Sequence, residues 1–387
     1  ARVGPAGARP DPMLMAGVQS VPITDPGFSD GMTMKMVGLQ QTIPYPGKLR
    51  LRTRAALAVV DAARAELDAA RSAVVRDVRA AYFEIAFLDR ALANVERARS
   101  TLATLVPVAV AGYAAGTGAQ GDVLAARTAA GQLAGEATAL LEARRAAVAR
   151  LNAALDRASD TPVIGAALPP RLLRAAAGDP ATPARFVSAV LGARLAGSPF
   201  PPLDSLQGLA ARLNPMLRAH EAGIVAQDAN VALARRERLP DVDVAVEYGQ
   251  RDGMRDLVTA TLSVPLPLQH ARKQDALTLA ATADLRALHA EHEAEVNRLR
   301  SEVARLLGAA ERDRAQLALY TRSIIPSARA ALASATAQYQ ASRGELGALL
   351  QSQAALYEHE TQYDRLLTDF ATTVAELEQV VGTEVLP

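Results

Sequence analysis

Two histidines of a predicted helix are the residues best suited, by type and spacing, to bind a metal ion. His289 and His292 are three positions apart, so they share one helix face, and Glu291, Glu293 and Glu295 lie close by. Imidazole and carboxylate groups can ligate divalent metals such as zinc. A solvent-exposed helix face explains the same residues more simply. We therefore predict no metal site, no cofactor and no catalytic residue here.

Methionine is concentrated in one short region of the chain. Five of the seven methionines are Met13, Met15, Met32, Met34 and Met36. Thioether sulfur suits soft cations such as monovalent copper or silver. The interpretation that we favour is that these are apolar strand residues facing lipid or a protein core.

Carboxylates recur at alternate positions of a predicted strand near residue 245. Asp241, Asp243 and Glu247 fall on one face, and the valines between them fall on the other. If several copies of the chain form a ring, these carboxylates would form a negative ring that attracts cations. Ordinary polarity of a water-facing strand remains the alternative.

Composition excludes several classes of function. The sequence has no cysteine, no Gly-rich phosphate-binding motif and no Ser/His/Asp arrangement, and we conclude that it is not an enzyme. Its 42 basic and 41 acidic residues give a net charge of +1, which gives no electrostatic reason to bind nucleic acid. Half of the residues are hydrophobic but only 4% are aromatic. Alanine supplies most of that apolar content, which favours slim, closely packed helices.

Two matching joints, 226 residues apart, indicate that the chain is two copies of one unit. They span residues 113–124 and 339–350, each between two long Ala-rich helical segments. The residues that match are Tyr113 and Tyr339, Gly118 and Gly344, Gly121 and Gly347, and Leu124 and Leu350. A second match pairs Ile43-Pro44-Tyr45-Pro46 with Val264-Pro265-Leu266-Pro267.

The repeat sets the predicted domain organisation. Residues 1–158 form the first repeat, with an irregular start, a β-hairpin at 12–46 and a helix pair at 47–157. A Pro-rich linker with short helices follows at 159–204. Residues 205–387 form the second repeat, with a lead-in helix at 214–238, a β-hairpin at 241–266 and a helix pair at 269–382. The first repeat has no counterpart of the lead-in helix, which we interpret as missing. Pro107 is expected to kink its long helix, whereas Pro326 is expected inside a continuous one.

The predicted strands fit a membrane barrel but cannot close one. They run over Met13 to Val21, Met32 to Ile43, and two segments within 241–266, each with one apolar and one polar face. Membrane strands need about 9–11 residues with this alternation. Four strands are too few for a barrel, whereas three chains supply twelve. The sequence has no run of about 18 apolar residues for a transmembrane helix. We therefore predict an α+β membrane protein that forms a hollow conduit.

The chain resembles the TolC-type outer-membrane efflux channels, most closely their heavy-metal, CzcC-like branch. Besides the duplication, the resemblance rests on Pro10-Asp11-Pro12-Met13, on Gln41 to Lys48 and on the first joint at 113–124. It implies a homotrimer with a twelve-stranded barrel in the outer membrane of a Gram-negative bacterium and an α-barrel in the periplasm. It also implies two partners, a periplasmic adaptor and an RND-type proton-driven pump of the inner membrane. The implied function is passive export of heavy-metal cations.

The joints are similar to the helical hairpin tips that meet the adaptor in this family. The resemblance thus assigns adaptor contact to Tyr113, Gly116, Gly118, Asp122, Tyr339 and Gly344. The second joint departs from the pattern, because Ser342 replaces Gly116 and Ala348 replaces Asp122. A helix cap and turn explains the same glycines without a partner. Charges at a narrow mouth are candidates for a gate, and here they are Asp122, Arg343 and Glu345.

Other functions stay open at this point. Drugs, organic compounds or type I secretion substrates could replace metals in a channel of the same family. A soluble coiled-coil scaffold or a periplasmic adaptor would also have long Ala-rich helical hairpins. Neither has a reason to carry four alternating strands, so the strands favour the channel.

Overall fold

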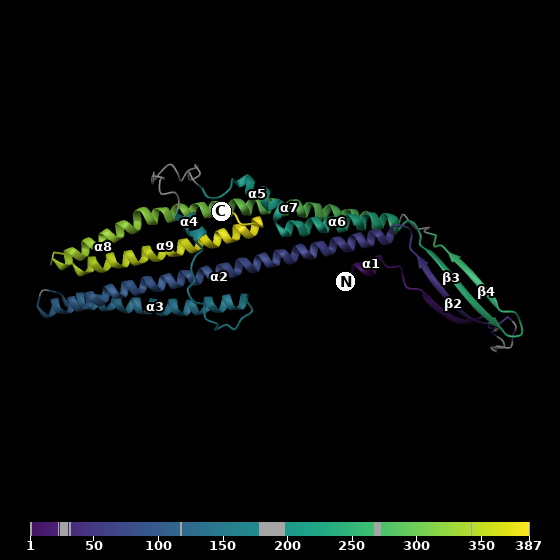
Figure 1. Ribbon diagram of the computed structural model, residues 1–387, viewed down its shortest axis with the longest axis horizontal. Helices are drawn as coiled ribbons and strands as arrows, with labels where there is room; N and C mark the ends of the chain where they lie inside the picture. The colour runs from purple at the N-terminus through teal and green to yellow at the C-terminus, as the bar shows by residue number, and fades with distance from the viewer. Residues whose placement is uncertain are drawn as a thin grey trace. The chain divides into compact units, whose positions relative to one another are not determined.

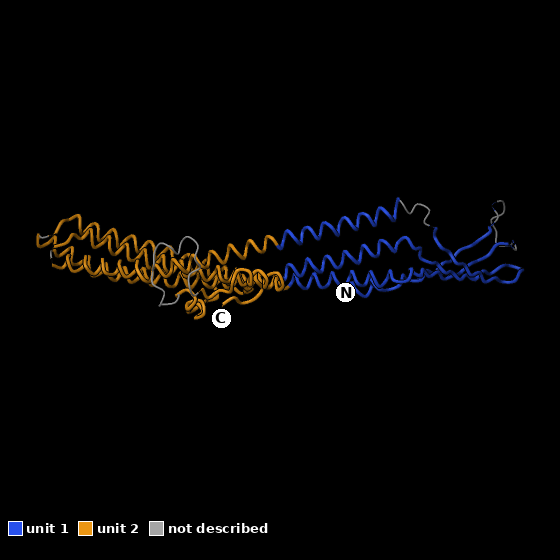
Figure 2. Tube along the Cα trace, turned by 90° about the horizontal axis from the view of Figure 1, so that it is seen from above, with its two compact units in different colours: residues 1–67, 215–296 blue, residues 68–214, 297–387 orange. Residues whose placement is uncertain are grey.

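The computed structural model describes residues 2–21, 23, 30, 32–116, 118–177, 198–266, 272–341 and 343–386. Figure 1 shows a four-stranded sheet and long helices, many of them in antiparallel pairs. The chain divides into two compact units (Figure 2). The first comprises Ala1–Leu67 and Pro215–Val296, and the second comprises Asp68–Asn214 and Asn297–Pro387.

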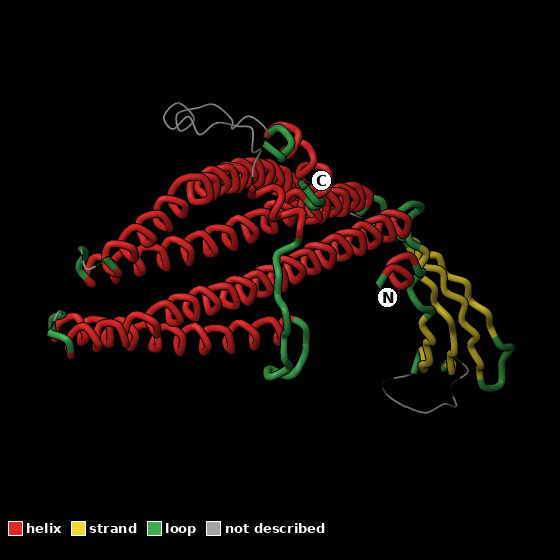
Figure 3. Tube along the Cα trace, turned by 60° about the vertical axis from the view of Figure 1, so that its left-hand side comes forward, coloured by secondary structure: helices red, strands yellow, loops and turns green. Residues whose placement is uncertain are grey.

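The first unit contains the sheet, whose strands are antiparallel and lie in the order β1-β2-β3-β4. They are β1 (Met13–Gln19), β2 (Met34–Ile43), β3 (Val242–Arg251) and β4 (Leu257–Ser263), drawn in yellow in Figure 3. The central pair joins the two sequence repeats, from Met34 opposite Arg251 to Ile43 opposite Val242. β1 and β4 are the edges, so each leaves one side of its backbone unpaired within the described chain.

Helices account for most of the remaining described residues. Their bounds are α1 (Val3–Gly7), α2 (Lys48–Ala114), α3 (Gln120–Ala154), α4 (Pro170–Ala177), α5 (Leu203–Leu213), α6 (Pro215–Arg236), α7 (Gln274–Leu319), a π-helical turn (Tyr320–Ile324), α8 (Ile325–Gln340) and α9 (Leu346–Val381). In the described residues, none of these helices combines the length and apolarity that a membrane span requires.

Element boundaries differ from the predictions at several points. Residues 3–7 form α1, where an irregular segment was expected. β1 ends at Gln19 rather than Val21, because Ser20 takes a left-handed backbone conformation with φ 60°. β2 begins at Met34, two residues later than expected. The predicted start of the second long helix, residue 269, lies outside the described residues.

Both helical prolines lie within long helical runs. α2 continues through Pro107 to Ala114 as one helix. Around Pro326, the unbroken helical run from α7 to α8 contains a π-helical turn that ends just before the proline. Pro326 has no N–H to donate to the carbonyl four residues earlier. A wider turn accommodates this loss, and π-turns of this kind are a recognised cause of helix irregularity.

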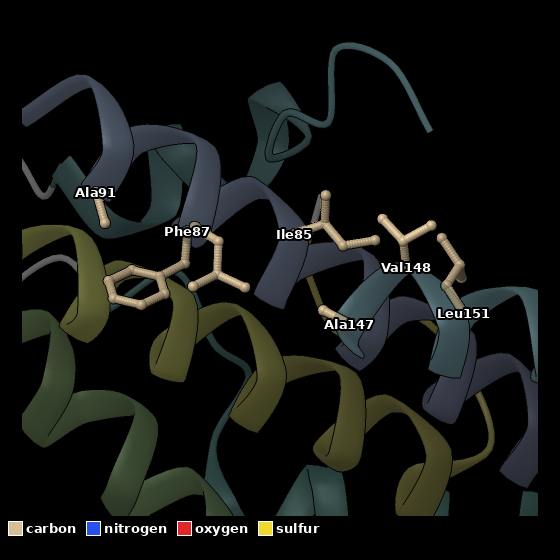
Figure 4. Close-up of a cluster of buried hydrophobic side chains, with 7 residues drawn as sticks. Ile85, Phe87, Ala91, Ala147, Val148 and Leu151 are labelled. Carbon is tan, nitrogen blue, oxygen red and sulfur yellow. The ribbon is translucent and has the colours of Figure 1, made fainter. Parts of the chain in front are cut away.

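Small and branched side chains hold the antiparallel helix pairs together. One cluster in the second unit joins Ile85, Phe87, Leu88 and Ala91 of α2 to Ala147, Val148 and Leu151 of α3. Figure 4 shows Ile85 of α2 beside Ala147, Val148 and Leu151 of α3, with Phe87 and Ala91 farther along α2. Ile85, Ala91 and Ala147 are fully buried. Alanine on both helices permits close approach, as the composition predicted.

Candidate functional site

The register of the sheet sorts its side chains onto one apolar and one polar face. Since side chains alternate along a strand, each paired position fixes the face of both residues. The apolar face carries Leu14, Val18, Val37, Leu39, Val244, Val246, Tyr248, Val258 and Leu262. The polar face carries Gln40, Thr42, Asp243, Glu247, Thr259, Thr261 and Ser263. Asp243 and Glu247 thus share a face, as their spacing predicted.

The two faces differ in exposure. On the apolar face, Leu39 is 57% exposed and Leu262 is 70% exposed. On the polar face, the central-strand residues are more covered: Met34, Met36 and Glu247 are half-buried, and Ala245 is 8% exposed. Along the two central strands, the polar face is therefore more covered than the apolar face.

Four methionines lie on the polar face. Met13 and Met15 of β1 and Met34 and Met36 of β2 have the same orientation as Glu247. The sequence suggested residues that face lipid or a core, so their position beside carboxylates and glutamines is unexpected. Both strands begin or end in a long connection, and no turn motif in the sequence fixes their register.

Two of the three carboxylates of the predicted ring form hydrogen bonds within the chain. Asp241 accepts hydrogen bonds from Lys48 Nζ at 2.8 Å and from the Tyr45 N–H at 2.8 Å. Asp243 Oδ1 accepts one from Thr42 Oγ1 at 2.5 Å. Glu247 forms no hydrogen bond or ion pair with any residue that the structure describes. Glu247 is therefore the carboxylate best placed to act on a solute.

A buried lysine joins the two repeats where the strands meet the helices. Lys48, the first residue of α2, is 1% exposed, and its Nζ lies 3.2 Å from Glu237 Oε2 and 2.8 Å from Asp241 Oδ1. Desolvation would raise the pKa of Asp241, but the hydrogen bonds from Lys48 and Tyr45 lower it below the ordinary value. Sequence reasoning quoted Lys48 within a junction motif but missed its partners.

The first hairpin tip is a close backbone turn between α2 and α3. The Gly116 N–H donates to the Tyr113 carbonyl and the Gly118 N–H to the Gly112 carbonyl, both at 3.0 Å. A Cβ on Gly118 would lie 3.3 Å from the backbone of Gly112 and Tyr113. Asp122 Oδ2 accepts a hydrogen bond from the Ala119 N–H at 3.4 Å, so its carboxylate caps the start of α3.

The second tip, between α8 and α9, repeats this close approach. A Cβ on Gly344 would lie 3.0 Å from Gln338 Cβ and 3.2 Å from the Tyr339 nitrogen. The Arg343 N–H donates to the Gln338 carbonyl at 2.9 Å. The matching of Gly118 with Gly344 therefore has a structural cause, which is that a side chain at either position would be tightly crowded by the preceding helix. Thr117 and Ser342 lie outside the described residues.

The tips pack on each other through a shared apolar cluster. Leu346 and Leu349 of α9 are 1% exposed and contact the cluster that contains Val123 of α3 and Leu105 of α2. Tyr339 packs against the same cluster, whereas Tyr113 is 50% exposed. Burial, followed by the negative charge of Asp122, raises the pKa of Tyr339. Tyr113 therefore presents its ring outward, and Tyr339 does not.

The predicted gate charges do not pair within one chain. Arg343 and Glu345 are exposed, and neither forms an ion pair with a residue in the described ranges. Asp122 is half-buried and is used as the cap described above. Within the described part of one chain, Asp122, Arg343 and Glu345 therefore form no ion pair with one another.

Polar contacts connect the hairpins farther from the tips. Asp364 of α9 accepts a hydrogen bond from Asn94 Nδ2 at 3.0 Å and lies 3.5 Å from Arg90. Glu360 pairs with Arg97 at 3.3 Å and with Arg329 at 2.6 Å. Burial raises the pKa of Asp364 despite these partners, because removing the carboxylate from water disfavours its charged form. The contacts set the alignment of α2, α8 and α9.

The histidine pair does not gather further ligands. His289 is exposed and His292 is half-buried on α7. Among the residues that the structure describes, no group of three or more His, Cys, Asp or Glu side chains is placed to hold a metal ion.

Comparisons with known proteins agree with this geometry. The model of the outer membrane efflux protein family matches residues 11–157 and 206–383. None of the curated proteins compared with the chain matches it. Among solved structures, the outer-membrane channel OprN is 16% identical, with a TM-score of 0.78 over 100% of this chain and 84% of that chain.

Two further solved structures have the same fold. The outer membrane protein VceC from Vibrio cholerae is 18% identical, with a TM-score of 0.76 over 99% of this chain and 89% of its own. CusC, whose transmembrane channel formation has been described, is 15% identical, with a TM-score of 0.78 over 99% of this chain and 86% of its own. Identities this low establish the fold alone.

Proposed function

The chain belongs to the outer membrane efflux protein family, and we propose that it is the outer-membrane exit channel of a tripartite efflux pump. The observation that carries the proposal is the four-stranded sheet, apolar on one face and polar on the other. Such a sheet can face lipid outside and water inside. The chain is not an enzyme; it conducts solutes passively toward the cell exterior, and the pump supplies the energy.

The proposed assembly is a homotrimer. One chain supplies four strands, and edges β1 and β4 both have seven residues. Unpaired strand edges in a membrane are costly, because no water is present to satisfy their backbone groups. Pairing β1 of one copy with β4 of the next removes every edge and gives a twelve-stranded barrel across the outer membrane. In the same ring of three copies, the paired helices form an α-barrel in the periplasm.

The proposed substrates are heavy-metal cations. The support is the sequence resemblance to the heavy-metal branch and the carboxylate of Glu247, which would occur three times in the lumen and attract cations. Drugs or organic compounds are the alternative substrates for the same channel.

The proposed partners are a periplasmic adaptor at the hairpin tips and an RND-type pump behind it. Two features support a docking role for the first tip. The aromatic side chain of Tyr113 is half exposed, and backbone hydrogen bonds of Gly116 and Gly118 fix the turn. The second tip contributes Gly344 and the more buried Tyr339.

Replacement of either tip glycine by alanine should abolish export that depends on the adaptor. In Gly118→Ala and Gly344→Ala the new Cβ meets backbone at 3.2–3.3 Å, so neighbouring atoms of the tip must shift by a few tenths of an ångström. We expect each change to cost about 1–3 kcal/mol locally, with trimers still formed. The measurement is metal tolerance of cells that rely on this channel with its adaptor and pump.

Matched controls come from the repeat itself. Gly121→Ala and Gly347→Ala add the same methyl group three residues away, where nothing lies within 4 Å. These variants should export normally. If all four variants export equally well, the tips do not dock the adaptor in the way proposed.

The charges Asp122, Arg343 and Glu345 are the proposed periplasmic gate. Since Arg343 has no acidic partner within the described part of its own chain, a pair with a neighbouring copy would hold the mouth closed. Exposed pairs contribute only about 0–1 kcal/mol each, which a docking partner could overcome. Arg343→Ala should therefore raise single-channel conductance in planar bilayers. Unchanged conductance in Arg343→Ala, Glu345→Ala and Asp122→Ala alike would assign closure to helix packing instead.

A further inference from the structure

We propose that the polar face of the β-sheet carries a methionine track that binds monovalent soft cations, Cu(I) or Ag(I), during transit. This track consists of Met13, Met15, Met36 and Met34. The inference rests on the proposed function, since it requires this face to line the lumen, and it narrows the substrate class from heavy metals to soft monovalent ones.

The register makes the track continuous. Met13 lies opposite Gln40, Met15 opposite Gly38, Met36 opposite Gly17, and Met34 opposite Gln19. These four residue pairs are the successive β1–β2 pairs on the polar face, which we call inward rungs, and each of them contains one methionine. Inward rungs are spaced by roughly 6.8 Å, so the track extends about 20 Å along the strands.

The two central methionines share one hollow. Met15 and Met36 line a depression of about 210 Å³ on the polar face, together with Gly17, Gly38 and Glu247. They are diagonal neighbours across the strands, a separation of about 7–8 Å that long side chains bridge. Gly17, opposite Met36, has open space where a Cβ would be, which leaves room for a flexible thioether, and the Glu247 side chain lies over Gly38, opposite Met15. The two sulfur atoms can therefore approach one cation from adjacent rungs.

The chemistry of this hollow selects the cation. Thioether sulfur is a soft, uncharged ligand that favours Cu(I) over hard cations such as Mg²⁺. The carboxylate of Glu247 supplies one negative charge beside the sulfurs, which matches one monovalent cation. A pair of thioethers binds weakly enough for release to the next rung, and conduction requires such weak, repeated sites. Apolar filling of the sheet would place these residues on the other face, where most of the valines and leucines of the sheet are.

The test is Ag⁺ binding to the purified protein in detergent, measured by calorimetry in chloride-free buffer. Met15→Leu/Met36→Leu removes both sulfurs of the hollow at nearly constant side-chain volume. The matched control is Met216→Leu/Met254→Leu, which removes two methionines outside the track. We expect the track variant to lose about tenfold or more in Ag⁺ affinity and the control to bind like wild type. Identical Ag⁺ isotherms for all three proteins would overturn the proposal.

Conductance separates failure of the track from failure of the channel. In planar bilayers, Ag⁺ should reduce the K⁺ current of wild type and of the control but not of the track variant, and Zn²⁺ should not distinguish them. Normal K⁺ current without any Ag⁺ effect would contradict the track and leave the channel standing. Methionine-dependent Ag⁺ binding by a protein that conducts no ions would contradict the channel, and with it the role of the track in transit.

Discussion

Lys48→Glu should prevent most of the protein from reaching its folded form. The Lys48 side chain is 2% exposed and pairs with both Glu237 and Asp241, so the change removes a buried cation and adds a third carboxylate. Breaking a buried ion pair typically costs about 3–5 kcal/mol. Since the partner side chains are 35% and 29% exposed, water screens part of the repulsion, and we expect a loss near the lower end.

The measurement is the midpoint of thermal unfolding in detergent and the yield of membrane-inserted protein. Arg50→Glu is the matched control, because it makes the same charge change two residues along α2 at an exposed position. It should behave like wild type. Equal losses in the two variants would mean that net charge, rather than the buried junction, determines stability.

Val246→Arg should impair membrane assembly by about 2–4 kcal/mol, the cost of a charged side chain on the lipid face near the bilayer midplane. Val246 lies at the middle of β3 on the apolar face and is 51% exposed in the single chain. In the proposed barrel that exposed surface contacts lipid. The measurement is the fraction of protein that folds into lipid vesicles. The folded fraction is read from electrophoresis as the heat-resistant oligomer.

Glu247→Gln is the control on the neighbouring residue at nearly the same depth. Glu247 belongs to the polar face and has no partner among the described residues, so its neutralisation should leave assembly intact and lower only cation selectivity. A larger folding defect in Glu247→Gln than in Val246→Arg would mean that the two faces are oriented the other way round.

The fold was predictable where its cause is local. Alternation of valines with polar residues at 242–248 specified a strand and its two faces. The glycine pair Gly118 and Gly344 marked the two turns, because the turns exclude a Cβ at both positions. Likewise, the length of α2 follows from an uninterrupted Ala-rich pattern. The π-turn before Pro326 was not predicted, because sequence alone does not say whether a proline lies within regular α-helix, as Pro107 does, or beside a π-turn.

The features that sequence reasoning missed depend on distant residues. Lys48 meets Glu237 and Asp241 across 189 and 193 residues of chain, and no local pattern links them. The methionine track depends on the register of β1 against β2, whose connection is too long for a turn motif to fix it. The alternation within each strand was visible, but which methionines faced the carboxylates was not.

The most direct test of the proposed channel is the native mass of the purified protein in detergent. A barrel can close only if several chains combine their four strands, so the mass should equal three times the 40.6 kDa of one chain, without the bound detergent. A stable, monodisperse monomer that stays in solution when detergent is removed would contradict the account, because one chain cannot enclose a channel.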